Sequence, residues 1–455
     1  MSSTNEAARV EEQIDRWRSY LRRRRAIHAV DVAELEDHLR GQVSAMVSVG
    51  LSPDEAFLVA VKRIGSLDAL SREFAREHSE RLWKQMVVVG SDSEAPGGKG
   101  SREGLVAFCL AVVAAALVKA PLLFGIPMAQ ESFYVRNASL FVLPLLTGYF
   151  AWKRRLGVRG VAGLAVAFVI GGLFANVYGF APGGSTLALT ALHLPMVLWL
   201  AVGVAYAGER WGQVGGRMDF VRFSGEFFVY YVLIALGGGV LTAFMAAIFK
   251  AIGVRLDLFF QGWLLPCGAA GAVLIAAWLA EAKQSVIENM APVLTRLFTP
   301  LFTAVLLAFL GTLVWTGRGI SAERDVILAF DALLVLVLGL LLYSVSARDP
   351  RSPPSGFDAL QIVLVVSALV ADAVALWAIA TRITEFGFTP NRVAALGENV
   401  ILLVNLTWSA VLYLRFLRGR GPFASLEKWQ TDYLPVYGVW SAIVVILFPP
   451  LFRYV

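Results

Sequence analysis

The sequence is poor in the residue types that mark most enzymes and disulfide-stabilised proteins. It has 2 cysteines and 4 histidines among 455 residues, and the cysteines share no CxxC spacing. A disulfide framework is therefore excluded. No nucleophile elbow, HExxH, nucleotide-binding fingerprint or paired-acid motif occurs on a plausible surface. The sequence predicts no enzymatic activity, no cofactor and no metal site.

Charged residues are also scarce, at 16% of the chain, whereas hydrophobic residues make up 57%. Ordinary soluble proteins have about 25% charged and about 45–50% apolar residues. Residues 1–100 hold 15 Lys and Arg with 16 Asp and Glu, which leaves 25 and 18 for the rest of the chain. The positive excess therefore belongs to the apolar part, and the basic isoelectric point does not indicate a nucleic-acid partner.

The first hundred residues lack a long apolar segment, so we expect no cleavable signal peptide there. Their pattern predicts four short helices, each with one apolar stripe that can contribute to a shared core. The Ser52–Glu55 segment is a capping box with proline at the first helical position, and Asp31–Glu34 has a similar pattern. We expect a cytoplasmic four-helix domain at 1–88 and a flexible linker at 89–103.

Long apolar runs fill the remainder, 104–455. A run of about 20 residues can cross the hydrocarbon core as a helix, and lipid forbids unpaired backbone groups. The sequence therefore predicts an all-α fold, a polytopic transmembrane helical bundle of about 11 spans with a small N-terminal soluble helical domain. The candidate spans lie near 104–125, 137–153, 158–178, 186–206, 224–249, 258–281, 293–316, 325–346, 357–380, 393–416 and 433–450.

Lysine and arginine are unequally distributed among the predicted loops. With the N-terminal domain inside, the inside loops hold 15 of these residues and the outside loops with the C-terminus hold 8. Positive residues favour the cytoplasmic side of a membrane. The sequence therefore predicts a multi-pass protein of the bacterial inner membrane, in contact with lipid and with a cytoplasmic N-terminus.

Ionisable side chains inside the predicted spans are the first candidates for function, because each is costly in lipid unless it is paired or hydrated. They form either a polar pathway or ligand site at the bundle centre, or pairs that fix helix packing. The sequence leaves both interpretations open, and Asp372, with long apolar flanks, is the strongest single candidate. The intramembrane polar candidates are Lys119, Asp331, Asp372, Glu398, Asn399 and Asn405.

A second polar cluster is predicted at the outer mouth of the ninth and tenth spans. Thr389 can cap a helix that begins with proline. That start places Glu385, Asn391 and Arg392 together, near the level at which Glu398 enters the tenth span.

Other features receive structural interpretations. His193 in the fourth span is expected to make a hydrogen-bonded helix contact, and Glu226 is expected to be an acid at the membrane interface. Gly237–Gly239 predicts a close helix approach. Cys109 and Cys267 lie in apolar runs and are expected to be small buried residues.

Two stretches resemble known bacterial families. Residues 30–85 resemble the bacterial permease-prefix domain. The similarity lies in Glu34-Leu-Glu-Asp-His-Leu39, Gly50-Leu-Ser-Pro-Asp-Glu-Ala-Phe57 and Lys62-Arg-Ile-Gly65. Residues 290–450 resemble a bacterial membrane family of unknown function. The similarity lies in Ala347-Arg-Asp349 and Glu385-Phe-Gly-Phe-Thr-Pro-Asn-Arg392. These families supply no established activity or catalytic residues. The chain lacks the large extracytoplasmic domain typical of ABC-type permeases, so the resemblance does not imply transport.

These patterns favour a signalling or regulatory membrane protein. Residues 1–88 would dock a cytoplasmic protein partner, and the bundle would sense an envelope or lipid signal. The alternative is a secondary transporter or channel-like permease for a small solute, using Asp372, Glu398 and Lys119. A membrane-embedded enzyme would need polar residues clustered at one depth beside a lipid-accessible cavity. The sequence indicates neither the ligand nor the oligomeric state.

Overall fold

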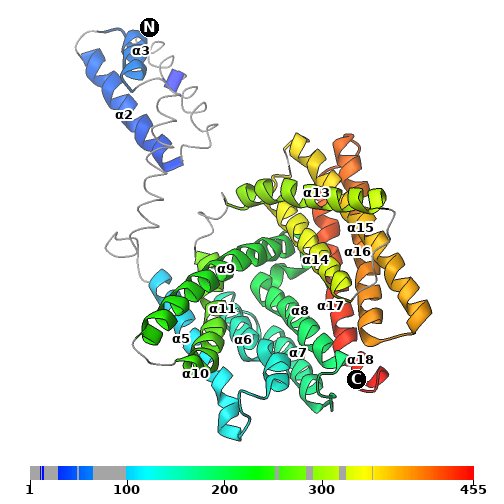
Figure 1. The fold of residues 1–455 in the computed structure, drawn as a ribbon. Coiled ribbons are helices and arrows are strands. Elements are labelled where there is room, and N and C mark those ends of the chain that lie inside the picture. Colours follow the sequence, from blue (N-terminus) through cyan, green and yellow to red (C-terminus); the bar gives the residue numbers. More distant parts are fainter. Residues whose placement is uncertain are drawn as a thin grey trace. The chain divides into compact units, whose positions relative to one another are not determined.

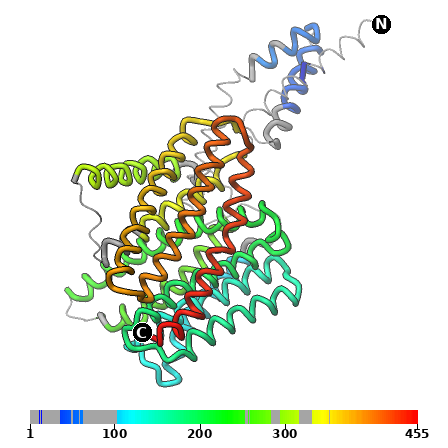
Figure 2. The backbone as a smooth tube through the Cα atoms, turned by 90° about the vertical axis from the view of Figure 1, so that its right-hand side faces the viewer, coloured from blue at the N-terminus to red at the C-terminus, as the bar shows by residue number. Residues whose placement is uncertain are grey.

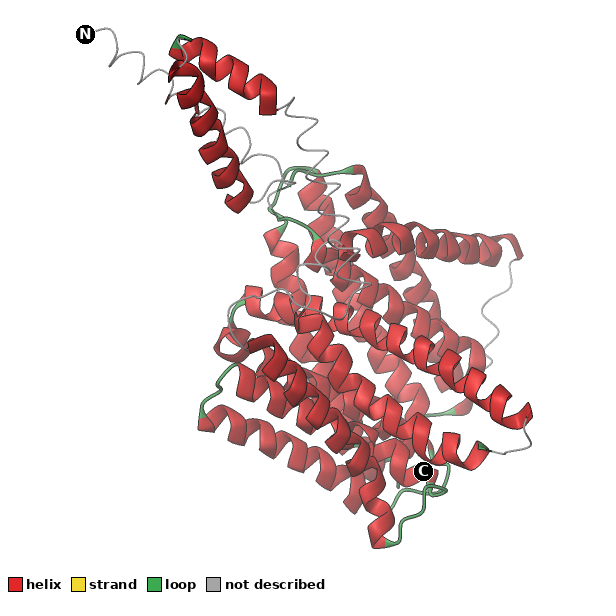
Figure 3. Ribbon diagram, turned by 90° about the vertical axis from the view of Figure 1, so that its left-hand side faces the viewer, coloured by secondary structure: helices red, strands yellow, loops and turns green. Residues whose placement is uncertain are grey.

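The chain divides into two compact units, Met1–Gly97 and Gly98–Val455. Every regular element in the residues that the structure describes is a helix (Figure 3), so the all-α prediction is confirmed. This computed structural model describes residues 11, 13–14, 29–48, 51–64, 99–251, 256–282, 290–316, 324–350 and 352–455.

The first unit contains α2 (Ala29–Ser48) and α3 (Pro53–Ile64). The Ser52 amide donates to Glu55 Oε2 at 3.2 Å, and the Glu55 amide donates to Ser52 Oγ at 3.4 Å. These atoms form the predicted capping box at α3. The hydrogen bonds from Ser52 lower the pKa of the Glu55 carboxyl below its ordinary value.

The start expected at Asp31–Glu34 is wrong, because α2 already begins at Ala29. Leu39 of α2 and Ala56 and Ala60 of α3 are fully buried, as a shared apolar stripe requires. Of the other two predicted helices of this unit, only Glu11, Gln13 and Ile14 of the first lie within the described residues.

The second unit is a bundle of long helices (Figure 1). In chain order they are α5 (Lys99–Lys119), α6 (Glu131–Lys153), α7 (Val158–Val177), α8 (Ser185–Ala207), α9 (Val214–Ala251), α11 (Leu265–Ala282), α13 (Met290–Thr316), α14 (Arg324–Ala347), α15 (Gly356–Phe386), α16 (Pro390–Leu417) and α17 (Ala424–Ile446). Shorter turns are η1 (Ala120–Phe124), η2 (Gly208–Gly212), α10 (Asp257–Phe259), η3 (Phe260–Leu264) and α18 (Phe448–Leu451). Helix α5 begins inside the segment expected to be a linker.

Within the described residues, 8 helices are long and apolar enough to cross a membrane, so the chain is a multi-pass membrane protein. They are α5, α7, α8, α9, α11, α13, α15 and α16. The predicted count of about 11 is not confirmed. Helix α6 starts with polar residues such as Glu131 and Arg136, and the first half of α17 carries Lys428 and Asp432. The apolar part of α14 that the structure describes, Asp331–Ala347, is short.

The bundle has two large apolar cores. One lies among α5 to α9 and α11. There the Tyr206 ring stacks on the Phe223 ring, with centroids 4.5 Å apart, and meets the Phe150 ring edge-on, with centroids 5.1 Å apart. The other lies among α13 to α17 and includes the fully buried Leu341 and Val365. Helices α15, α16 and α17 run side by side in Figure 2, whereas α13 lies across its neighbours α14 and α15.

Hydrogen bonds identify the two ends of this unit. At the end that we call the C-terminal end, the Ala181 amide donates to the Tyr454 carbonyl at 2.9 Å, just before α8 begins. At the opposite end, which we call the basic end, Arg154 donates to the Tyr206 carbonyl at 3.0 Å, where α8 finishes. Lys153 also lies there, 2.8 Å from Glu103.

Several local predictions are wrong, because the exposure of a residue depends on which face of its helix it occupies and not on its residue type. Gly237–Gly239 are exposed, and a Cβ on any of them would meet no neighbour within 4 Å, so they do not mediate a close approach. Cys109 is exposed and Cys267 is only half-buried. Glu226 of α9 is buried, and its expected place at the membrane interface stays a prediction.

Candidate functional site

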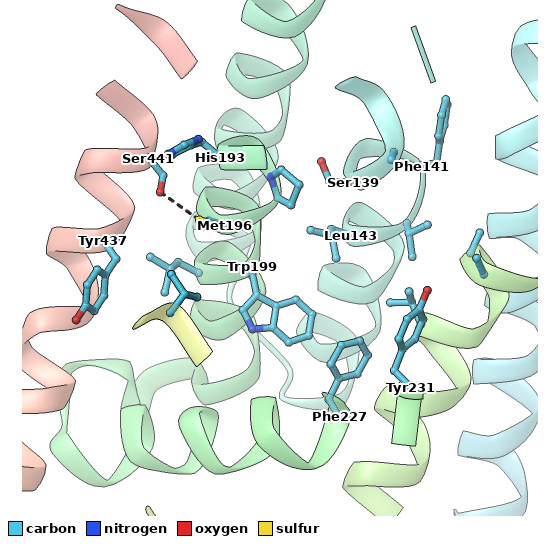
Figure 4. A pocket seen from close by; sticks show the side chains of 18 of the residues that line it. Ser139, Phe141, Leu143, His193, Met196, Trp199, Phe227, Tyr231, Tyr437 and Ser441 are labelled. Carbon is cyan, nitrogen blue, oxygen red and sulfur yellow. Dashed lines mark hydrogen bonds between the residues drawn. The ribbon is translucent and has the colours of Figure 1, made fainter. Parts of the chain in front are cut away.

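A large cavity lies between the two groups of helices in the second unit. Its volume is about 850 Å³, within the range of about 300–1,000 Å³ that is usual for small-molecule sites. Helices α6, α8 and α11 form one wall, and α14, α16 and α17 form the other. Figure 4 shows side chains from several of these helices around it.

The cavity lining is predominantly apolar and aromatic. Trp199 of α8 and Phe227 of α9 face it with ring centroids 4.7 Å apart (Figure 4). Leu143 and Met196 add aliphatic surface. Such a surface favours a ligand with an apolar body, because stripping water from a strongly polar solute here would go uncompensated.

The cavity also contains polar atoms that lack hydrogen-bond partners. Ser139 Oγ, Tyr437 Oη and Trp440 Nε1 are all buried, and no partner for them exists within the part of the chain that the structure describes. Ser441, by contrast, donates to the Met196 sulfur at 3.8 Å (Figure 4). Buried groups without partners are costly. These three atoms are sealed in the cavity wall, so a ligand group would reach them only after neighbouring side chains move.

A histidine–glutamate pair borders the same cavity. His193 Nε2 of α8 lies 2.7 Å from Glu398 Oε1 of α16, and His193 Nδ1 lies 2.8 Å from the Leu189 carbonyl. Because a carbonyl only accepts, Nδ1 carries a hydrogen. The Nε2–Oε1 contact then holds one proton, either on an imidazolium beside a carboxylate or on a carboxylic acid beside a neutral imidazole.

The pair is held at matching depth by its two helices. His193 and Glu398 each lie 8 residues from the start of their helices, about 12 Å along the axis. Both helices begin at the C-terminal end. The histidine side chain is 4% exposed and the glutamate 30%, so Glu398 is the member that the cavity reaches more easily.

Two further acids predicted inside the membrane, Asp331 and Asp372, interact next to this pair. Asn399 follows Glu398 in α16 and donates to Asp331 Oδ1 of α14 at 2.9 Å. Asp331 interacts electrostatically with Glu398 and with Asp372 of α15. Successive residues of a helix point in different directions. Helix α16 therefore presents Glu398 to the cavity and Asn399 to the acids.

The structure does not bring Lys119 and Asn405 to this cluster. The Lys119 ammonium lies 4.5 Å from the ring centroid of Trp263, at the far end of α5. Asn405 donates to Gln430 of α17 at 3.2 Å, and Gln430 donates to Ser409 at 2.7 Å. All three members of that network are fully buried, so it fixes the packing of α16 on α17.

The predicted outer-mouth residues lie near the start of α16. Thr389 caps that helix, accepting from the Arg392 amide at 3.5 Å. The Arg392 guanidinium donates to the Phe386 and Gly387 carbonyls at 3.1 and 2.9 Å, which closes the C-terminus of α15. Asn391 donates to a serine of α8 at 3.2 Å, whereas Glu385 is exposed.

The basic end carries a smaller, polar cavity of about 330 Å³. Arg154 and Arg210 line it with their ion-pair partners Glu281 and Asp219, each pair at 2.8 Å. Opposite charges are balanced there.

Some lining residues were missed in the sequence, although a signal for them exists. Tyr437, Trp440 and Ser441 recur at the spacing of one helical face in α17. The same spacing relates His193 and Met196 in α8. The pattern identifies a face of each helix but not which helices meet.

No protein-family model, curated protein or solved structure matches this chain. The two family resemblances therefore stay predictions.

Proposed function

We propose that the second unit binds an amphiphilic small molecule, with an apolar body and a polar head group, in the cavity between its two groups of helices. The observation that carries this proposal is an apolar cavity of about 850 Å³ that also holds the His193–Glu398 pair. The apolar walls suit a lipid-like body, and the partly exposed Glu398 carboxyl group at the cavity suits a polar head group.

The membrane setting supports the same class of ligand. Lipid-like molecules partition into the bilayer and reach such a cavity from the side, without crossing an aqueous entrance. The proposed topology places about 11 spans in a bacterial inner membrane, one for each apolar run of roughly 20 residues in the sequence. It has a cytoplasmic N-terminus because Lys153, Arg154 and the other cations of the basic end favour that side.

In this proposal the protein is a sensor. The first unit, of permease-prefix type, docks a cytoplasmic protein. It signals to that protein whether the cavity is occupied. Support comes from the division of the chain into two compact units, the first of which has the charge content of a soluble domain. A chain shortened to residues 99–455 is expected to bind the ligand as the full chain does, but to lose the cellular response that the full chain gives. Full cellular effect from that shortened chain contradicts the docking role.

The binding proposal is tested by filling the cavity. Ala269 lines it, and Ala269→Trp places an indole inside; Ala247, exposed on α9 away from the cavity, gives the matched control Ala247→Trp. Each protein is purified in nanodiscs made of one defined lipid, and co-purified molecules are extracted and weighed by mass spectrometry.

We expect a roughly stoichiometric amphiphile with the wild type and Ala247→Trp, and at least a tenfold loss with Ala269→Trp, which corresponds to about 1.4 kcal/mol. Equal recovery from all three proteins, or none from any, contradicts the proposal.

The alternative is a secondary transporter for a small solute. It is favoured by the electrostatic interaction of Asp331 with both Glu398 and Asp372 inside the bundle. Uptake into proteoliposomes that depends on pH or on a cation, and that Asp372→Asn and Glu398→Gln abolish, would decide for transport over sensing.

A further inference from the structure

We propose that Asp331, Asp372 and Asn399 form an intramembrane binding site for a single monovalent cation, either a proton or Na⁺. The site lies beside the amphiphile cavity but does not depend on it, so either proposal can fail alone.

Asp372 has no means of neutralisation among the residues that the structure describes. Its side chain is 0% exposed, and neither carboxylate oxygen has a hydrogen-bond partner in that part of the chain. It lies 14 residues from Phe386 at the end of α15, about 21 Å along the helix axis. A bare carboxylate so deep in an apolar environment is strongly unfavourable, so a positive charge must accompany it.

The charged groups that act on Asp372 are themselves acidic. Asp331 of α14 acts on it electrostatically, and Glu398 of α16 acts on Asp331 in turn. His193 is the nearest base in this chain of contacts, but its Nε2 is already bonded to Glu398. Two neighbouring buried carboxylates cannot both stay ionised without a shared proton or metal ion. The pair therefore calls for one added positive charge.

Asn399 supplies the second, independent observation. Its Nδ2 donates both hydrogens, to Asp331 Oδ1 at 2.9 Å and to the Ala395 carbonyl at 2.8 Å. Its Oδ1 is buried and has no partner within the described residues, while the side chain as a whole is 0% exposed. An unused amide oxygen and two unused carboxylate oxygens give the site acceptors without donors, which is the ligand set of a hard cation.

Burial increases along the cluster. Glu398 is 30% exposed at the cavity, Asp331 is half-buried, and Asp372 is sealed. The cluster is therefore open to the cavity at Glu398 and closed at Asp372.

The first test measures the site in the intact wild-type protein. Purified protein in nanodiscs is treated with a hydrophobic carbodiimide, which modifies only protonated carboxyl groups, and the labelled peptides are quantified by mass spectrometry. We expect labelling at Asp372 that falls as pH rises. If Na⁺ is the occupant, NaCl protects Asp372 at fixed pH relative to choline chloride of equal ionic strength. If the proton is the occupant, only pH has an effect. Labelling that is absent, or unchanged by both, overturns the proposal.

The second test uses Asp372→Asn, with Glu385→Gln as the matched control because that exposed carboxylate lies on the same helix outside the cluster. Melting temperatures are compared across pH and with NaCl or choline chloride. The wild type and Glu385→Gln lose stability as pH rises without Na⁺, since the pair is then left ionised. Asp372→Asn should lose that dependence. If it does not fold, Asp331→Asn replaces it, because either substitution removes one charge of the pair. Equal dependence in all folded variants overturns the proposal.

Discussion

Removing the Arg348 guanidinium should be among the most damaging single changes in the second unit. Arg348 follows α14, and its Nε donates to Asp358 Oδ1 of α15 at 2.8 Å while Nη2 donates to Oδ2 at 3.1 Å. The guanidinium also lies 4.6 and 4.4 Å from the ring centroids of Phe416 and Phe423. This one side chain therefore joins the connection between α14 and α15 to α16 and the segment before α17.

The expected cost follows from burial. The Arg348 side chain is 14% exposed and that of Asp358 is 2%, so solvent screens the pair little. Removing one partner of a buried ion pair costs about 3–5 kcal/mol, because the remaining charge is left unpaired. Arg348→Met keeps much of the apolar contact with the two rings. It removes the ion pair together with the guanidinium's hydrogen bonds to the backbone carbonyls of residues 349, 352 and 353.

The assay is the free energy of unfolding in detergent micelles, followed by tryptophan fluorescence. Arg348→Met should lose about 3–5 kcal/mol, and the double variant Arg348→Met, Asp358→Asn should recover most of it, because replacing both partners removes the buried charge. The loss also loosens α14 against α15, which carry Asp331 and Asp372. A loss under about 1 kcal/mol, as for an exposed pair, would refute this reasoning.

Three further outcomes are expected. Glu398→Gln should reduce amphiphile recovery about 10-fold or more through loss of a charge-assisted hydrogen bond; unchanged recovery in the nanodisc assay would remove the pair from head-group binding. Gly397→Ala should displace the Trp440 ring, because the new Cβ overlaps that ring; a changed tryptophan emission maximum checks it, and Gly148→Ala, with open space around its Cβ, is the control. Gln430→Leu should cost about 1–3 kcal/mol by leaving buried polar partners on α16 unsatisfied, and a free energy of unfolding equal to the wild type would contradict the network.

The intramembrane acids show how far sequence reasoning reaches. Asp331, Asp372 and Glu398 stand out in the sequence because any charge in an apolar run needs a partner. Their mutual interaction was not predictable, since it depends on which faces of α14, α15 and α16 pack together. Lys119 has the same sequence signature as the acids, yet the end of α5 carries it to Trp263 instead.

The interpretation of His193 changed most between sequence and structure. A hydrogen-bonded helix contact was predicted and is present, but its partner is Glu398, 205 positions away. No local pattern encodes such a pairing. Glycines illustrate the same limit, because Gly237–Gly239 face open space whereas a Cβ on Gly203 would come within 2.6 Å of the Phe220 ring.

The sequence by itself determined that this is an all-helical, multi-pass membrane protein with a charged first unit. Those properties follow from composition, apolar run length and local capping, as at Ser52 and Thr389, and each acts within a few residues of the chain. Only the tertiary structure decided where the polar groups meet, that an apolar cavity separates the two groups of helices, and that Asp372 is left without a partner among the described residues. These depend on which helix faces pack together, which in lipid is set by shape and polar contacts across the whole bundle rather than by any local pattern.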